Sequence, residues 1–132
     1  MADQILGRWE LVSSDKYEDY LKAAGVGMIQ RTMASKAHPI MEWLQKDGKW
    51  VQKTSTAIKK FEIVFVPGEI FDEELADGRK SKSTVHVEGN TLTHKQSTGG
   101  EESEVQRVFN GNEMVTTFKC GGVVATRVFK RI

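Results

Sequence analysis

The pattern of hydrophobic and polar positions changes near residue 47. From there to the end, segments rich in Val, Ile, Thr and Phe alternate with short turns in which glycine and asparagine can supply the positive φ that tight turns require. Because strands joined by such short turns cannot be parallel, the pattern predicts many antiparallel strands, and therefore a β-sandwich or a β-barrel. The turn signals are Asp47-Gly48, Pro67-Gly68, Asp77-Gly78, Gly89-Asn90, Gly99-Gly100, Gly111-Asn112 and Gly121-Gly122.

A helical periodicity occupies part of the chain before residue 47. After a predicted first strand over residues 5–13, apolar residues recur at helical spacing from Tyr17 to Ala24. We expect this helix to begin with a capping box, with Asp15 as the N-cap and a glutamate three residues further on. A second helix is predicted over residues 27–37, before a proline. Two short helices between the first two strands indicate a lid or plug on the β-structure.

Two arginines occupy an ambiguous place in the predicted strands. Side chains alternate between the two faces of a strand, so Arg107 shares a face with Val105 and Phe109. Arg127 likewise shares a face with Phe129. If these faces point inward, each guanidinium needs a carboxylate, water or an anionic ligand, because burying an unpaired charge is costly. If they point outward, both are ordinary solvated residues, and alternation alone leaves the two interpretations open.

Size and charge exclude several classes of protein. The chain has 132 residues, which indicates one domain over residues 1–132. Nineteen Lys and Arg residues against eighteen Asp and Glu residues give a formal net charge of +1, so no basic field for nucleic acid is expected. The single cysteine, Cys120, excludes an internal disulfide framework and a multi-cysteine zinc site. We expect a monomer in the cytoplasm, with no apolar leader at the N-terminus and no membrane span.

The residues that could carry chemistry are few. His38, His86 and His94 are not spaced as metal ligands on one helix face, and we expect each to be an ordinary surface or loop residue. No nucleophile elbow or phosphate loop is recognisable, and Cys120 has no evident histidine partner. The sequence therefore predicts a protein that is not an enzyme and that uses no metal or cofactor.

Four stretches of the chain together carry a resemblance that none of them carries alone. They are Gly7–Gly27, Ser55–Lys60, Phe71–Ser83 and Gly122–Arg131. In this order they resemble the cellular fatty-acid-binding family of intracellular lipid-binding proteins over nearly the whole chain. The resemblance implies an all-β fold, a ten-stranded antiparallel up-and-down barrel (a β-clam) capped by an N-terminal helix-turn-helix. It also implies a reversible carrier that holds a long-chain fatty acid in an internal cavity and admits it through the helical lid.

The same resemblance implies how the head group is held. Arg107 and Arg127 fall at the two arginine positions that hold the carboxylate in many members, so both are expected to point inward. The family's usual tyrosine is replaced by Phe129, which removes one hydroxyl donor to the carboxylate. The alternatives are retinoic acid, which would keep both arginines but lose the same hydroxyl, or a different hydrophobic molecule whose head group is not a free carboxylate.

Further positions follow by resemblance. Lys22 and Arg31 on the lid imply transient contact with an anionic membrane surface, with ordinary solvated charges as the other interpretation. The entrance is expected to be lined by Tyr17, Val26, Ile58 and Ala76. The cavity wall is expected to include Tyr20, Ala34, Pro39, Asp77, Arg79, Thr116 and Phe118.

Overall fold

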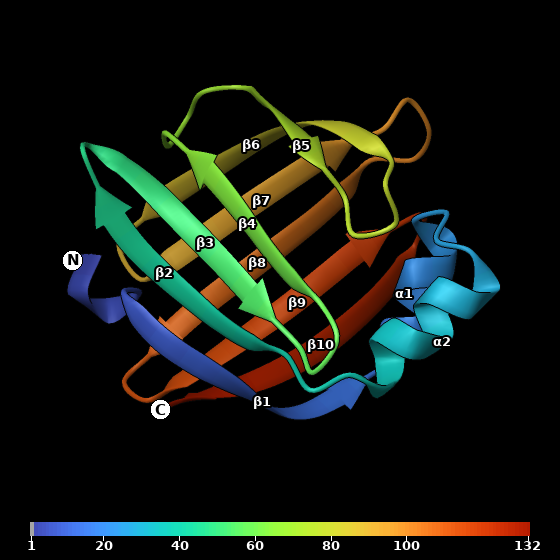
Figure 1. Cartoon of the computed structure of the whole chain (residues 1–132), viewed down its shortest axis with the longest axis horizontal. Coiled ribbons are helices and arrows are strands. Elements are labelled where there is room, and N and C mark those ends of the chain that lie inside the picture. Colours follow the sequence, from blue (N-terminus) through green and yellow to red (C-terminus); the bar gives the residue numbers. More distant parts are fainter. Residues whose placement is uncertain (1) are drawn as a thin grey trace.

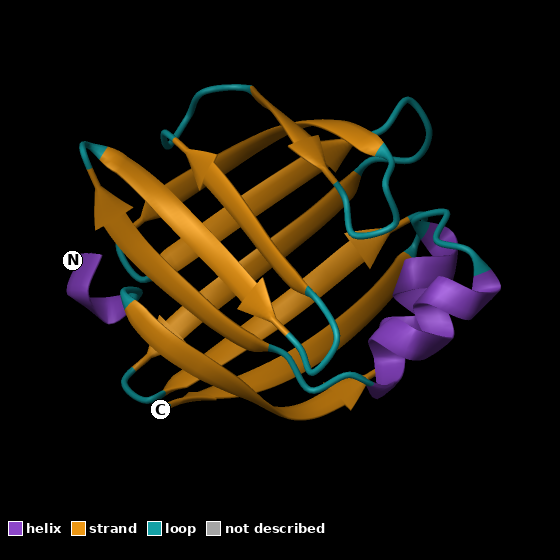
Figure 2. Cartoon of the chain, viewed as in Figure 1, coloured by secondary structure: helices purple, strands orange, loops and turns teal. Residues whose placement is uncertain are grey.

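The computed structural model describes residues 2–132, in which ten strands wrap around one interior and two helices lie at one end (Figures 1 and 2). Helices α1 (Tyr17–Ala23) and α2 (Met28–Lys36) connect the first two strands, and a short 3₁₀ helix, η1 (Ala2–Gln4), precedes them. No helix in this part of the chain is long and apolar enough to cross a membrane. The strands are β1 (Gly7–Asp15), β2 (Ile40–Lys46), β3 (Lys49–Ser55), β4 (Lys60–Phe65), β5 (Phe71–Glu74), β6 (Lys80–Glu88), β7 (Thr91–Ser97), β8 (Ser103–Asn110), β9 (Glu113–Cys120) and β10 (Val123–Arg131).

The strands form one antiparallel sheet in the order β4-β3-β2-β1-β10-β9-β8-β7-β6-β5. Except for β4 and β5, strands adjacent in sequence pair with each other, and the first strand pairs with the last. Within residues 2–132, no hydrogen-bonded ladder joins β4 to β5, so the barrel carries one seam (Figure 1). The predicted ten-stranded up-and-down barrel with a helical cap is confirmed. The seam was not predicted from the sequence, because the Pro67-Gly68 turn joins two strands that do not pair.

The hairpin between β2 and β3 shows why the turn signals were informative. Two residues, Asp47 and Gly48, connect these strands, and both have positive φ, at 54° and 79°. This is the conformation of a two-residue hairpin turn whose twist matches that of the flanking strands. The short turn therefore fixes the antiparallel register of β2 and β3, as predicted.

The start of α1 differs from the prediction. Asp15 is the last residue of β1 and pairs with Thr126 of β10, so it is not an N-cap. The N-cap is Lys16, which is left-handed with φ 61°, and no side chain caps the helix. The predicted capping box between Asp15 and Glu18 is therefore wrong, because pairing with β10 extends β1 past its predicted end at Ser13.

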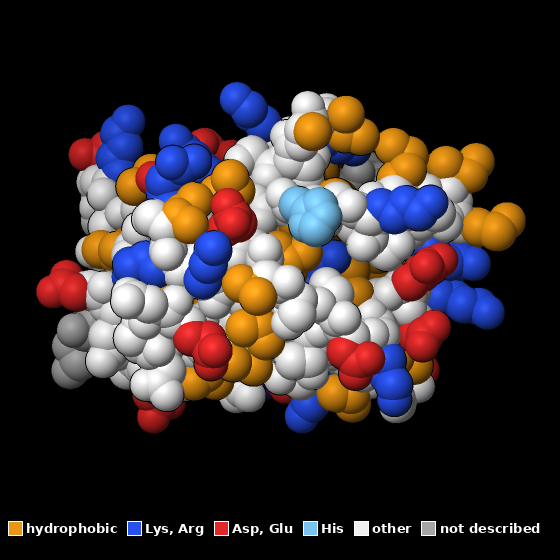
Figure 3. All heavy atoms as spheres, turned by 90° about the horizontal axis from the view of Figure 1, so that it is seen from below, with side chains coloured by type: hydrophobic (Ala, Val, Ile, Leu, Met, Phe, Trp, Pro, Cys, Tyr) orange, Lys and Arg blue, Asp and Glu red, His pale blue; other side chains and the backbone are white. Residues whose placement is uncertain are grey.

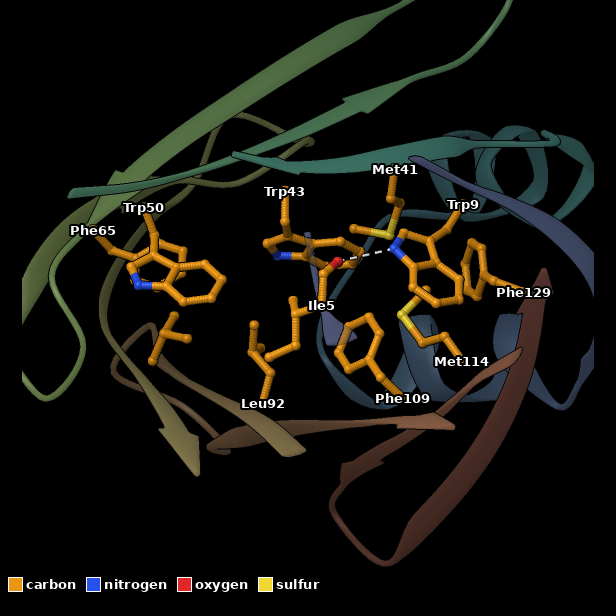
Figure 4. Close-up of a cluster of buried hydrophobic side chains, with 11 residues drawn as sticks. Ile5, Trp9, Met41, Trp43, Trp50, Phe65, Leu92, Phe109, Met114 and Phe129 are labelled. Carbon is orange, nitrogen blue, oxygen red and sulfur yellow. Dashed lines mark hydrogen bonds between the residues drawn. The ribbon is translucent and has the colours of Figure 1, made fainter. Parts of the chain in front are cut away.

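Two hydrophobic clusters fill the interior at different heights. The first, here the tryptophan cluster, lies away from the helices, and in it Phe109 packs edge to face on Trp9 and Trp43 at ring distances of 5.1 and 5.3 Å (Figure 4). Its members are Ile5, Trp9, Met41, Trp43, Trp50, Phe65, Val85, Leu92, Phe109, Met114 and Phe129. The second, here the lid cluster, packs against α1 and consists of Tyr20, Leu21, Val105, Phe118, Cys120 and Ala125.

Candidate ligand-binding site

A row of polar side chains crosses three neighbouring strands between the two clusters. Arg107 of β8 pairs in register with Thr116 of β9, which pairs with Arg127 of β10. Each of the three, here the arginine row, is at least 94% buried, with exposed fractions of 6%, 0% and 3%. The inward orientation implied by the resemblance is confirmed. The flanking inward positions are Phe109, Met114 and Phe129 of the tryptophan cluster on one side, and Val105, Phe118 and Ala125 of the lid cluster on the other.

The arginine row has more hydrogen-bond donors than acceptors. Nη1 of Arg107 donates to Oγ1 of Thr116 at 3.0 Å. The buried Nε of Arg107, and both Nε and Nη2 of Arg127, have no hydrogen-bond partner among residues 2–132. Neither guanidinium forms an ion pair with a carboxylate in that range. Because buried donors are nearly always paired in proteins, this arrangement is suited to an anionic acceptor from outside the chain.

Burial lowers the pKa of both arginines but does not remove their charge. It lowers the pKa of Arg107 to about 10, and the neighbouring charge of Arg127 acts in the same direction. Burial lowers the pKa of Arg127 as well. Both guanidiniums remain protonated at neutral pH, so the interior holds two positive charges.

Aromatic rings surround the two guanidiniums. The ring of Tyr17, the first residue of α1, lies 3.6 Å from Cζ of Arg127. Tyr17 in turn contacts Tyr20 and Phe118, with ring centroids 6.1 and 5.0 Å away. Cζ of Arg107 lies 5.4 Å from the centroid of the Trp43 ring. The arginine row is thus bounded by π-faces, which attract cations and exclude water.

Phe129 has no cation–π contact with either guanidinium among the described residues. It follows Arg127 by two residues on the same face of β10, but it belongs to the tryptophan cluster and is 1% exposed. Its ring lies beside Trp9 in Figure 4. The position therefore contributes apolar packing next to the arginine row and no hydroxyl.

Four other predicted positions lie between the helices and the barrel or at its rim. Val26, in the linker between α1 and α2, and Ala34 of α2 both pack against the lid cluster. Pro39 is buried just before β2, and its carbonyl accepts the N–H of Leu11 at 3.3 Å. Ile58 is different, because it lies in the β3–β4 turn with 75% of its surface exposed.

Three predicted positions, Ala76, Asp77 and Arg79, lie in the β5–β6 turn, which contacts the β3–β4 turn and the linker between the helices. Nε of Arg79 donates to Oδ2 of Asp77 at 2.6 Å. The Arg79 guanidinium lies against Gly25, since a Cβ placed on Gly25 would be 2.7 Å from Nη1. The Ala76 carbonyl accepts from Nζ of Lys59, in the β3–β4 turn, at 2.8 Å. The two turns and the linker between the helices therefore enclose one end of the barrel.

Sequence reasoning missed a second polar group in the interior. Oε1 of Glu73 lies 2.9 Å from Nε2 of His94 and accepts from Ser83 and Gln96 at 2.8 and 3.1 Å. His94 is 4% exposed, so the prediction that it lies on the surface is wrong, whereas His38 and His86 are exposed as expected.

The partners of Glu73 also determine its pKa. Burial alone would raise the pKa of Glu73, but the hydrogen bonds from His94, Gln96 and Ser83 and the charge of His94 outweigh burial and lower that pKa. Strand alternation could have found the pair, because Glu73 shares a face with Phe71 and His94 shares one with Leu92.

Comparison with known proteins agrees with this architecture. The profile of the lipocalin / cytosolic fatty-acid binding protein family matches residues 6–132. A muscle fatty acid-binding protein of Schistocerca gregaria is 42% identical over 133 residues, covering 98% of both chains. Sodium/calcium exchanger regulatory protein 1 of Doryteuthis pealeii is 40% identical over 132 residues, covering 100% of this chain and 99% of its own. The structure of a Schistosoma mansoni fatty acid binding protein in complex with arachidonic acid superposes with a TM-score of 0.94 at 29% identity, covering 98% of this chain and 96% of that one.

Fold and site together define a helix-capped β-barrel with a buried pair of unneutralised arginines. The chain belongs to the lipocalin / cytosolic fatty-acid binding protein family. The resemblance seen in the sequence is thereby confirmed.

Proposed function

We propose that this protein is a reversible carrier of a long-chain fatty acid in the cytoplasm. Residues 1–132 act as one monomeric lipid-binding domain, with neither enzymatic activity nor a cofactor. The names of several relatives support this proposal, since they are fatty acid-binding proteins, and one related structure is described as a complex with arachidonic acid.

One observation carries the proposal. Three buried donor nitrogens, on Arg107 and Arg127, have no partner within residues 2–132 and lie between two apolar clusters. A carboxylate would accept charge-assisted hydrogen bonds from them and offset the cost of burying both charges. The hydrocarbon tail would supply most of the affinity through burial, at about 25 cal/mol per Å² of apolar surface.

The ligand-contacting residues follow from the same proposal. Arg107 and Arg127 hold the carboxylate, and the ligand passes between the helices and the two adjacent turns. The tail and the route of entry are lined by Tyr17, Tyr20, Val26, Ala34, Pro39, Ile58, Ala76, Asp77, Arg79, Thr116, Phe118 and Phe129.

Native mass spectrometry of the purified protein, followed by organic extraction, tests the ligand class directly. A one-to-one adduct that releases a long-chain fatty acid is the expected result. Release of retinoic acid, or of a lipid without a free carboxylate, would favour the alternative ligand. An empty protein that also fails to bind added oleate would refute the carrier proposal.

The Arg127→Gln variant tests the role of the arginines. It removes the positive charge and the paired donors Nε and Nη2 of Arg127. Oleate affinity should therefore fall by about a hundredfold, as expected from the loss of two charge-assisted hydrogen bonds. The affinity for oleyl alcohol, which has the same chain and no charge, should change little in calorimetric titrations. Equal losses for both ligands would mean that Arg127 serves the fold and not the head group.

We also propose that the helical lid touches membranes during transfer. Supporting this, α2 contributes no buried residue and exposes Met28, Ile29 and Met33, with fractions of 67%, 75% and 51%. Figure 3 shows hydrophobic side chains projecting at the end of the molecule that carries the helices, with Lys or Arg side chains beside them. Lys22 is exposed, but Arg31 donates to the Val26 carbonyl at 3.2 Å and faces Glu18 at 3.9 Å. The contact therefore depends on the apolar side chains and on Lys22, and less on Arg31.

A further inference from the structure

The two guanidiniums of the arginine row do not present the same groups to the interior. Arg107 uses Nη1 to bond Thr116, and Nε is its one buried nitrogen without a partner in residues 2–132. Arg127 has two such nitrogens, Nε and Nη2. These two lie on the same edge of the planar group and form the fork that binds both oxygens of a carboxylate. Arg127 therefore offers both nitrogens of one edge for bidentate binding, whereas Arg107 is already held by Thr116 through Nη1.

The orientation of that fork is restrained from one direction. Cζ of Arg127 lies 3.6 Å from the centroid of the Tyr17 ring, which covers a face of the guanidinium. No hydrogen bond or ion pair within residues 2–132 holds Nε or Nη2 of Arg127. The Tyr17 ring therefore restrains the guanidinium plane where no hydrogen bond to Nε or Nη2 does so.

The Tyr17 ring is itself held in place. It stacks on Tyr20 with an interplanar angle of 22° and packs on Phe118 at 5.0 Å. Tyr20 and Phe118 are buried, with exposed fractions of 5% and 6%, so the ring rests on a fixed apolar wall. Phe129 lies in the other cluster and offers no hydroxyl with which to orient the head group.

We propose that Tyr17 is a positioning residue for head-group binding: by stacking on Arg127 it holds the Nε and Nη2 edge toward the interior, ready for a carboxylate. This inference rests on the proposed fatty acid carrier function and adds a specificity-determining role to a position otherwise expected only to line the entrance. A ring that orients the fork makes a larger contribution to binding an acid than to binding a neutral molecule of the same length.

The test compares two ligands of equal chain, oleic acid and oleyl alcohol, by isothermal titration calorimetry at neutral pH. The readout is the acid preference, the ratio of the two association constants. Tyr17→Leu removes the ring and should lower the acid preference by roughly tenfold, which corresponds to losing a desolvated cation–π contact. Tyr17→Phe keeps the ring without the hydroxyl and should restore the preference. Binding of the alcohol reports that each variant is folded, and Tyr17→Met replaces Tyr17→Leu if the latter unfolds.

A double-mutant cycle shows whether Tyr17 acts through Arg127. In the Arg127→Gln background, Tyr17→Leu should leave the acid preference unchanged, because there is no fork to orient. Equal losses for acid and alcohol in Tyr17→Leu would reduce Tyr17 to a tail contact and overturn the inference. A tenfold loss that persists without Arg127 would also overturn it.

The two proposals fail in different ways. If the wild-type protein binds neither ligand, the carrier function fails and the inference fails with it. If the wild type binds oleate with a preference that depends on Arg127 but not on the ring at position 17, the carrier function stands and only the role of Tyr17 is refuted.

Discussion

Arg131 shows how one side chain can close the end of a barrel. Its Nη1 and Nη2 donate to the carbonyls of Leu6 and Gln4, at 2.7 and 3.0 Å, and its guanidinium lies 4.2 Å from the Trp9 ring. The last strand is thus joined to the segment that precedes the first. Space for this contact exists because Gly7, with φ 119°, has no side chain.

Replacing Gly7 with alanine tests this closure. A Cβ at this position would lie 2.7 Å from Nη1 of Arg131, and its φ is one that side chains rarely adopt. We expect the free energy of unfolding in urea to fall by about 2–3 kcal/mol, from backbone strain and weakened hydrogen bonds. Gly100→Ala is the matched control, since a Cβ there meets nothing within 4 Å. The control should stay within about 0.5 kcal/mol of the wild type. A Gly7→Ala protein as stable as the control would contradict this account.

The residues of the site differ in how far the sequence revealed them. Alternation placed Arg107 and Arg127 on mixed faces and left their direction open, because Val occurs on both faces of these strands. The resemblance resolved that direction, and burial confirms it. The stacking of Tyr17 on Arg127 could not be predicted, since it depends on how α1 lies across β10 and on a three-dimensional register that strand parity does not contain.

At the scale of elements, the Glu73 network stabilises the edge of the sheet. Strand β5 has four residues and, among residues 2–132, pairs only with β6, so its backbone has hydrogen-bonded partners on one side. The Glu73 side chain adds bonds to Ser83 on β6 and to His94 and Gln96 on β7. Inward hydrogen bonds thereby tie the shortest strand to the two strands beyond it.

Glu73→Gln should reveal this contribution through its pH dependence. Because the folded protein lowers the pKa of Glu73 below its ordinary value of 4.5, the ionised carboxylate stabilises the fold above that pH. The stability should be lost as the pH falls through the lowered pKa. We expect the variant to lose about 1–3 kcal/mol in urea unfolding at neutral pH. The difference from the wild type should narrow in acid, below pH 4.5.

The neighbouring carboxylate supplies the control. Glu74 points outward, and its ion pair with Lys80, at 3.9 Å, joins two exposed side chains. Glu74→Gln should change stability by no more than about 0.5 kcal/mol at any pH, since exposed pairs contribute little. A Glu73→Gln deficit that remained constant into acid would mean that shape, and not charge, makes Glu73 stabilising.

Helices and strands were predictable to different degrees for physical reasons. Turns rich in Gly and Asn punctuate the strands, and α2 lies within its predicted range of 27–37. The start of α1 was mispredicted because Asp15 has the chemistry of a cap, whereas pairing with Thr126 outweighs that local preference. The seam was not predictable either, since the turn at Pro67-Gly68 looks like any other hairpin signal.

At the scale of the whole molecule, α2 offers an unburied apolar face beside the proposed entrance. Ile29→Glu should slow transfer of a fluorescent fatty acid to phosphatidylglycerol vesicles by about tenfold, by removing an apolar anchor from the contact with the vesicle. Oleate affinity should be unchanged, because Ile29 is 75% exposed. Gln30→Glu adds the same charge at an adjacent exposed position without removing an apolar group. Equal slowing in both variants would attribute the effect to charge alone, and no slowing in either would refute the lid contact.

Because β4 and β5 do not pair within residues 2–132, the barrel is an open sheet with two edges and not a ring closed by hydrogen bonds. A ring held by hydrogen bonds on every side has a fixed girth, because widening it breaks a ladder. A sheet wrapped until two free edges face each other can widen there while every ladder stays intact. In the sheet order, β10 lies five strands from the β4 edge and six from the β5 edge, counting both ends. The arginine row, on β8 to β10, therefore lies at least four strands from either free edge by the same count, so widening at the seam would leave its three strands paired with each other.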